Sequence, residues 1–317
     1  MVCHPLAIVL ALRRGVAAIL SMGALSLAMS VTARADLLFI TNSGGGSVGV
    51  FDTTGATLGE PLFQGVNQPE GIAASGSNLF VTAIGGGSIG TGTVGEYAAN
   101  SGAAVNASLI TGLTFPVGIA VSGSNLFVTS NNGSNNVIGE YTTSGATVNA
   151  SLITGLSGSP NIAVSGSNLF VVDQARGAIG EYTTSGATVN ASLITGLSTV
   201  GNPISIAVSG SNLFVATPNL GTIGEYTTSG ATVNASLVTG LSFLNGIAVS
   251  GSDLFVTDGS GVVGEYTTSG ATVNASLISS EFADGPGMVI VPVPEPATGL
   301  LVMGGVLGLA IRRRNEG

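Results

Sequence analysis

Three residue types that serve much of enzyme chemistry are nearly absent from this chain of 317 residues. It has no lysine, and its only cysteine (Cys3) and only histidine (His4) lie in a leader that we expect to be removed, as described below. The common nucleophile–base pairs therefore cannot form in the mature chain, and we expect no classical catalytic activity. Without cysteine pairs, no disulfide stabilises the exported fold.

Positive charge is also scarce. Between Asp36 and Val293 the only basic residue is Arg176, against fourteen Asp and Glu residues. Nucleic-acid binding requires clustered Lys and Arg that displace counterions, so the composition excludes it. A basic patch for anionic lipid or polysaccharide is likewise not expected, whereas an acidic surface favours cations such as calcium. With 44% hydrophobic residues the chain can fill a core.

Residues 1–35 have the pattern of a secretory signal peptide. Arg13 and Arg14 precede the apolar stretch Gly15–Met29, and Ala33 and Ala35 form a small-x-small cleavage site. The paired arginines are typical of twin-arginine export, but Gly15 and Val16 follow them, which favours the ordinary Sec route. A membrane-spanning helix is the alternative, for which the apolar stretch is short.

A repeat of about 40 residues occupies most of the remaining chain. Its Gly-Glu-Tyr core ends at Tyr97, Tyr141, Tyr182, Tyr226 and Tyr266, at spacings of 44, 41, 44 and 40 residues. One copy predicts four short strands, because β-branched and aromatic residues alternate with turns of Gly, Ser and Asn. We expect these strands at Gly118–Val121, Asn125–Thr129, Val137–Thr142 and Thr147–Ile153. Four-stranded units of this length are typical of propeller blades.

The count of copies is six, and the first is incomplete. Leu37–Val66 lacks the opening GIAV strand, whereas Gly287–Val291 (GMVIV) resembles that strand and has no repeat after it. We therefore expect a six-bladed, all-β propeller of four-stranded antiparallel blades, in which the C-terminal strand completes blade 1 and removes the open edges. A β-solenoid is the alternative, but it gives no reason for the lone final strand.

The repeat resembles that of NHL-type propellers, whose pattern reads P-x-GIAV, then G-N-L-Y-V-T-D, then N-x-I-x-x-F. The counterparts here are Pro116–Val121, Ser124–Thr129 and Ile138–Tyr141, and the likeness extends over Asp36–Val291. It also resembles streptogramin-lyase-like propellers, whose chemistry relies on the histidine that the mature chain lacks.

The predicted connections fall into two classes. The SGSN and TTSGAT turns are nearly identical in every full copy, and we call the end of the ring that carries them the constant face. The loops between strands two and three, and the crossovers between blades, differ in every copy and lie at the opposite end, the variable face. We take this face as a possible ligand-binding surface, although its loops also vary if nothing constrains them. Its candidate residues are Glu70, Asn161, Asp173, Arg176, Asn245 and Asp258.

Two kinds of enzyme remain as alternatives. One is a hydrolase with a pair of carboxylates, as in glycosidases. The other is a metal-dependent enzyme resembling the gluconolactonase-like six-bladed family, whose ligands are Glu, Asn and Asp. Calcium is then the expected ion, with Glu70, Asn161 and Asn245 as weak candidate ligands and Asp173, Asp258 or Asp284 as further ones. Few of these positions are level with one another in the blades, so we expect no cofactor.

Three further repeated features have structural interpretations. The glutamate of Gly-Glu-Tyr corresponds to Val50 in the first copy, so we expect a strand position at a blade boundary, with the tyrosine between blades. The Asn-Ala-Ser sequons, such as Asn149–Ser151, are expected at strand ends. The repeated threonines suggest an ice- or sugar-binding adhesin as a minor alternative.

The end of the chain has three parts: a proline motif (Pro294, Glu295, Pro296), the apolar segment Ala297–Ile311, which we expect to form a transmembrane helix, and a basic cluster (Arg312, Arg313, Arg314). By the positive-inside rule the arginines stay cytoplasmic. In this order the parts resemble the PEP-CTERM sorting signal of Gram-negative bacteria. The resemblance implies processing by an exosortase-type protease, transient contact with the inner membrane, and delivery to the cell surface or extracellular matrix.

The sequence thus predicts a signal peptide (1–35), a six-bladed propeller (36–292) and a sorting segment (293–317). The expected function is non-catalytic: a surface or matrix protein whose variable face binds a polysaccharide or a protein. The ligand and the oligomeric state are not determined by the sequence.

Overall fold

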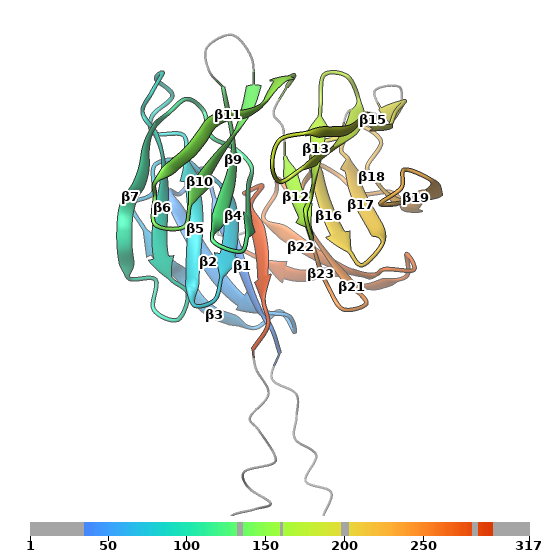
Figure 1. Cartoon of the computed structure of the whole chain (residues 1–317). Coiled ribbons are helices and arrows are strands. Elements are labelled where there is room, and N and C mark those ends of the chain that lie inside the picture. Colours follow the sequence, from blue (N-terminus) through green and yellow to red (C-terminus); the bar gives the residue numbers. More distant parts are fainter. Residues whose placement is uncertain (1–34, 132–135, 159–160, 198–202, 281–284, 294–317) are drawn as a thin grey trace, which may run out of the picture. The chain divides into compact units, whose positions relative to one another are not determined.

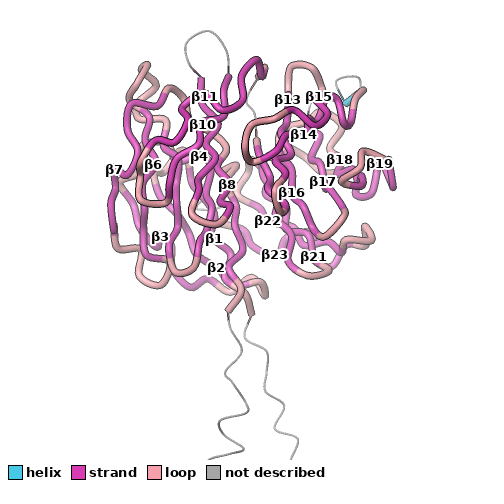
Figure 2. The backbone as a smooth tube through the Cα atoms, viewed as in Figure 1, coloured by secondary structure: helices cyan, strands magenta, loops and turns pink. Residues whose placement is uncertain are grey.

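The computed structural model describes residues 35–131, 136–158, 161–197, 203–280 and 285–293. These residues are almost entirely strands and turns (Figure 2). Among them, no helix is long and apolar enough to cross a membrane. The expected signal helix, the expected C-terminal helix, and the proline and arginine motifs of the tail lie outside the described residues.

Six four-stranded antiparallel sheets form the blades, as the repeat predicts (Figure 1). Blade 1 contains β24 (Met288–Val291), β1 (Leu37–Asn42), β2 (Ser47–Asp52) and β3 (Thr57–Gln64). Blade 2 contains β4 (Pro69–Ser75), β5 (Asn78–Ala83), β6 (Gly92–Ala98) and β7 (Ala104–Leu113). Blades 3 and 4 contain β8 (Ile119–Ser122), β9 (Asn125–Asn131), β10 (Asn136–Thr142), β11 (Thr147–Leu156), and β12 (Ile162–Ser165), β13 (Asn168–Asp173), β14 (Ala178–Thr183), β15 (Thr188–Ile194). Blades 5 and 6 contain β16 (Ser205–Ser209), β17 (Asn212–Thr217), β18 (Thr222–Thr227), β19 (Thr232–Val238), and β20 (Leu244–Ser250), β21 (Asp253–Asp258), β22 (Val262–Thr267), β23 (Thr272–Ser279).

The last strand completes the first blade. β24 pairs antiparallel with β1, and the register places Leu37 opposite Val291 and Ile40 opposite Met288. The two ends are also joined by a side chain, because Asp36 Oδ1 accepts a hydrogen bond of 3.3 Å from the backbone N–H of Val293. The ring therefore has no open edge at this junction, which confirms the expected closure.

The hydrophobic core lies between blades. Each of six buried clusters joins two neighbours: Tyr226 of blade 5, for example, packs with Phe170 and Ile179 of blade 4. At the junction of blades 6 and 1, Phe51 replaces the tyrosine and packs against Phe255. Because the strands alternate inward and outward side chains, each blade supplies both of its interfaces from one pattern.

The Gly-Glu-Tyr motif has a steric basis. A Cβ atom at Gly139 would lie 2.7 Å from the ring of Tyr141, so only glycine lets the tyrosine lie across its own strand. The glutamate is held within the blade, since Glu140 accepts a 2.7 Å hydrogen bond from Asn125. The same bond recurs in three other copies. The structural interpretation of this glutamate series is confirmed.

The turns of the constant face are uniform because they touch the preceding blade. Gly145 has a φ of 88°, and a Cβ there would lie 2.5 Å from the carbonyl oxygen of Leu109 in blade 2. Every blade repeats this contact between a turn glycine and a leucine of its neighbour. A side chain at this position meets both backbone strain and a clash, so packing fixes the sequence of these turns.

The Asn-Ala-Ser sequons lie inside the outer strands rather than at their ends. Asn149, in the exposed part of β11, accepts a hydrogen bond from the N–H of Ser151 at 3.0 Å. The register between β10 and β11 shifts at this point. The resulting bulge twists an outer edge that carries no charge, a device that disfavours edge-to-edge pairing.

A buried threonine at the end of the second strand links neighbouring blades. In blade 2 the hydroxyl of Thr82 accepts from Gly71 N at 2.7 Å and donates to Val117 O of blade 3 at 2.8 Å. In the closing blade, Thr41 accepts from Gly287 N and donates to Glu70 O, both at 3.0 Å. We call this contact the threonine bridge.

Closure is testable with an engineered disulfide because the propeller contains no cysteine. We expect the pair Leu37→Cys with Val291→Cys, in the chain that begins at Asp36, to oxidise readily and to raise the free energy of unfolding by up to about 5 kcal/mol. Mass spectrometry and urea unfolding measure this. The control pair Leu37→Cys with Val189→Cys, which joins blades 1 and 4, should stay reduced. A reduced 37–291 pair would contradict the closure.

The threonine bridge is testable by an isosteric change. Thr82→Val leaves the partly buried N–H of Gly71 without its acceptor and should lower the free energy of unfolding by about 1–3 kcal/mol. Thr272→Val, on an exposed outer strand, is the matched control and should change stability by less than about 0.5 kcal/mol. Equal unfolding curves for the two variants would rule out an energetic role for the bridge.

Candidate functional site

The termini of the described chain lie on the constant face. Figure 1 shows β1 beginning and β24 ending side by side at the lower end, together with the turns between strands one and two. The loops between strands two and three lie at the upper end. The variable face thus points away from residue 293, where the chain continues into its C-terminal segment.

A small pocket of about 80 Å³ is formed by the first strands of the blades on the variable face, and we call it the axial pocket. Its polar side chains are those of Glu70, Asn161 and Ser205. The structure therefore brings together two of the six predicted ligand-face residues. Asn245 is not among the residues that line this pocket.

Glycine dominates one level of the pocket for a steric reason. The equivalent residues of the six blades, which we call the ring position, are Gly71, Gly118, Asn161, Ser205, Gly246 and Gly287. A Cβ atom at Gly71 would lie 2.2 Å from Val117 O of the next blade, and one at Gly287 would lie 2.1 Å from Glu70 O.

In blades 4 and 5 this constraint is relaxed. Where Asn161 and Ser205 replace glycine, strand two carries Val172 and Ala216 instead of the bridging threonine. The pocket is thus asymmetric because the ring position and the strand-two position of the bridging threonine change together in these two blades. Ser205 was not predicted as a site residue from the sequence, although it stands where most other copies have glycine.

Among the residues that the structure describes, Glu70 is the only charged one that lines the axial pocket. Burial raises the pKa of its carboxyl group to about 6, although a hydrogen bond from the Ser43 side chain partly offsets this. A carboxyl group of this kind changes its charge in mildly acidic solution. One such group can bind or release a proton or orient a polar ligand, but a glycosidase requires two.

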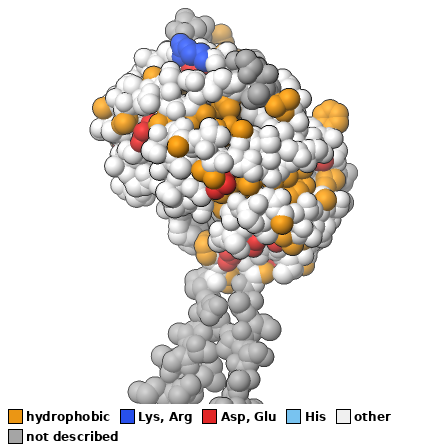
Figure 3. Space-filling model, turned by 90° about the vertical axis from the view of Figure 1, so that its right-hand side faces the viewer, with side chains coloured by type: hydrophobic (Ala, Val, Ile, Leu, Met, Phe, Trp, Pro, Cys, Tyr) orange, Lys and Arg blue, Asp and Glu red, His pale blue; other side chains and the backbone are white. Residues whose placement is uncertain are grey.

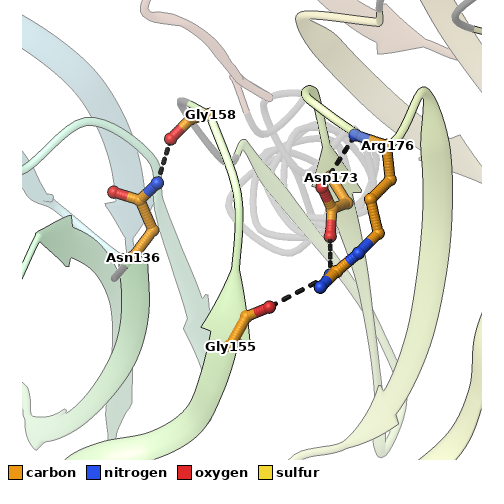
Figure 4. A network of polar contacts seen from close by, with 5 residues as sticks. All are labelled: Asn136, Gly155, Gly158, Asp173 and Arg176. Atoms are coloured by element: carbon orange, nitrogen blue, oxygen red, sulfur yellow. Dashed lines mark hydrogen bonds and ion pairs between the residues drawn. The ribbon is translucent and has the colours of Figure 1, made fainter. Parts of the chain in front are cut away.

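Asp173 and Arg176 pair with each other on the variable face. The guanidinium group of Arg176 lies 2.5 Å from Asp173 Oδ2 and also donates to Gly155 O of blade 3 at 3.0 Å (Figure 4). Asp173 is buried. Arg176 is the only Lys or Arg among the described residues, and Figure 3 shows basic side-chain atoms at the end opposite the termini. Arg176 therefore ties two blades together while its own side chain stays exposed to solvent.

The other candidates that the structure describes, Asp258 and Asn245, do not line the axial pocket. Asp258 Oδ1 accepts from Ser260 N and Val262 N, both at 2.9 Å, and so caps its own loop. It lines a separate cavity of about 280 Å³ with Tyr266. Asn245 lies in β20, and Asp284 lies outside the described residues. Within the described ranges, no group of three or more His, Cys, Asp or Glu side chains is placed to hold a metal ion.

The charge of Glu70 predicts a pH dependence of stability. In the folded chain the carboxyl titrates near 6, against an ordinary value of 4.5, so the folded state binds more protons between these values. The contribution of this carboxyl group to the free energy of unfolding is fully present below about pH 4.5. It is lost as the pH rises through 6, which lowers the free energy of unfolding by about 2 kcal/mol.

Glu70→Gln should remove this step and stabilise the protein at pH 7, as measured by urea unfolding across the pH range. Glu96→Gln replaces a carboxylate that accepts from Asn78 away from the pocket, and should leave the step in place. A wild-type profile with no such step would contradict the assignment.

Comparison with known proteins identifies the C-terminal segment and the fold. The PEP-CTERM protein-sorting motif matches residues 292–314. No curated protein matches the chain. A solved structure of a nidogen/laminin complex is similar, with 16% identity and a TM-score of 0.66 over 81% of this chain and 98% of that chain. A protein of unknown function from Bacteroides caccae is similar at 14% identity and a TM-score of 0.58, over 82% and 100%. At these identities the likeness shows the fold alone. The chain is a six-bladed β-propeller protein that carries a PEP-CTERM protein-sorting motif directly after its last strand.

Proposed function

We propose that this protein is an exported, non-catalytic binding protein of the cell surface or extracellular matrix. Its propeller presents the variable face to a polysaccharide or protein partner after an exosortase-type protease has processed the tail. The PEP-CTERM motif implies export through an exosortase system by way of a membrane-anchored precursor.

The position of the tail carries this proposal. β24 ends at Val291, the motif begins at residue 292, and this end of the chain lies on the constant face. A propeller held by its tail therefore directs the variable loops away from the point of attachment. Because the motif begins after the last strand, processing within it leaves all four strands of blade 1 in place.

A hydrolase is the alternative, and one observation favours it. The carboxyl group of Glu70 has a pKa of about 6, which suits a general acid near neutral pH. The described residues that line the axial pocket, however, supply one carboxylate, and the pocket of about 80 Å³ is too small for a sugar ring. These properties support binding over hydrolysis.

Fractionation of the host tests the localisation. The full chain should be recovered from the cell surface or the extracellular material. A chain that ends at Val293 should be exported but released to the periplasm or the medium, because it lacks the sorting segment. Equal retention of both forms would count against sorting by the tail.

Attachment of a bulky polymer tests which face binds. Binding is measured between the full chain, kept in detergent, and the extracellular material of the host. A maleimide polymer on Ser260→Cys, in a loop of the variable face, should abolish binding by steric exclusion. The same polymer on Ser144→Cys, in a turn of the constant face, should leave binding unchanged. Loss of binding with the polymer on Ser144→Cys, but not with the polymer on Ser260→Cys, would overturn the proposal.

A further inference from the structure

We propose that Phe115 and the cavity beside it form a subsite for one neutral sugar unit of a polysaccharide. This inference rests on the proposed function, because it names the class of ligand that the variable face takes. It begins from a backbone conformation that recurs in the crossovers between blades.

The residue three places before the ring position adopts a positive φ wherever the structure describes it. The angles are 53° at Gln68, 46° at Phe115, 80° at Gly158 and 53° at Phe243. The path of the crossover therefore imposes this conformation. Glycine adopts it without strain, as in blade 4, whereas a side chain with a Cβ atom does so only at a steric penalty. The architecture does not require a phenylalanine here.

Burial does not explain the two phenylalanines. The exposed fraction is 38% for Phe115 and 77% for Phe243. A strained residue that gains little from the core is a candidate for contact with a ligand. The two residues also differ in what surrounds them. Phe115 lines a cavity of about 420 Å³, whereas Phe243 lines neither this cavity nor the axial pocket nor the cavity beside Asp258.

The cavity beside Phe115 is lined by residues of blades 2 and 3 and of the crossover to blade 4. Its polar side chains include those of Ser130, Asn131 and Asn136, and none of the described residues that line it is charged. Its volume lies in the range of small-molecule sites. By contrast, the groove near Glu140 and Asn149 is lined by residues whose types recur in the other copies of the repeat.

Two hydrogen bonds hold this cavity in shape. The N–H of Asn131 donates to Thr114 O at 2.8 Å, which ties the blade 3 loop to the crossover that carries Phe115. The side chain of Asn136 donates to Gly158 O in the next crossover (Figure 4). These bonds hold the backbone of both crossovers against the ends of β9 and β10.

The lining matches the surface of a neutral sugar. Hydroxyl and amide groups offer both donors and acceptors to sugar hydroxyls, and an exposed aromatic face packs against the apolar C–H face of a pyranose. The propeller has a net negative charge and a single arginine, which is already paired, so anionic sugars are disfavoured.

The test uses the full chain in detergent and beads that carry maltohexaose, mannohexaose, galactohexaose or, as an anionic probe, oligogalacturonate. We expect binding to at least one neutral sugar. Phe115→Gly and Phe115→Gln should weaken it about tenfold or more, and Phe115→Tyr should retain it. Glycine and glutamine occupy the equivalent position in blades 4 and 2, so both variants suit the backbone. Phe243→Gly is the matched control and should bind as the wild type.

Two outcomes would overturn the subsite: equal binding by the Phe115→Gly and Phe243→Gly variants, or wild-type binding to none of the three neutral sugars, whether or not oligogalacturonate is bound. Either result leaves the proposed function standing if the polymer on Ser260→Cys still blocks binding to host material. Failure of that blocking experiment would remove the proposed function itself.

Discussion

The pairing of β24 with β1 is the contact on which the rest of the structure depends. It joins residues more than 240 positions apart and converts six similar sheets into a ring without an open edge at the junction. The threonine bridge from Thr41 to Gly287 and Glu70 repeats, at this junction, the contact that links other blades. Closure also fixes where the sorting motif leaves the domain, because the motif begins directly after β24.

The difference between the two faces follows from how the blades touch. On the constant face each turn glycine lies against a leucine of the preceding blade, so the turn sequence is held by packing. In the described parts of the loops between strands two and three, no glycine makes that contact with a leucine of the preceding blade, which permits their variation without showing that they recognise anything. The argument for recognition therefore rests on particular residues: Glu70 with a raised pKa in the axial pocket, and Phe115 in an unfavourable backbone conformation beside a cavity.

The candidate site was predicted only in part. Glu70 and Asn161 come together because crossovers of different blades meet around the axis, and the Gly, Asn and Ser of the ring position set which blades contribute a side chain. Asp173 and Arg176 were expected as ligand residues and instead pair with each other. Asp258 satisfies the N–H groups of its own loop. Phe115 carries no sequence signal, because its significance lies in its φ angle and in a cavity lined by residues of blades 2 and 3 and of the crossover to blade 4.

The sequence by itself determined the number of blades, the order of strands within them and the closing segment, because a repeat with strict alternation leaves one way to bury its apolar residues. It also determined the sorting motif, which is read from contiguous residues. Only the tertiary structure decided which side chains share a pocket, which charges pair and which residues are strained. Those properties depend on distances between neighbouring blades, and a repeat pattern does not contain such distances.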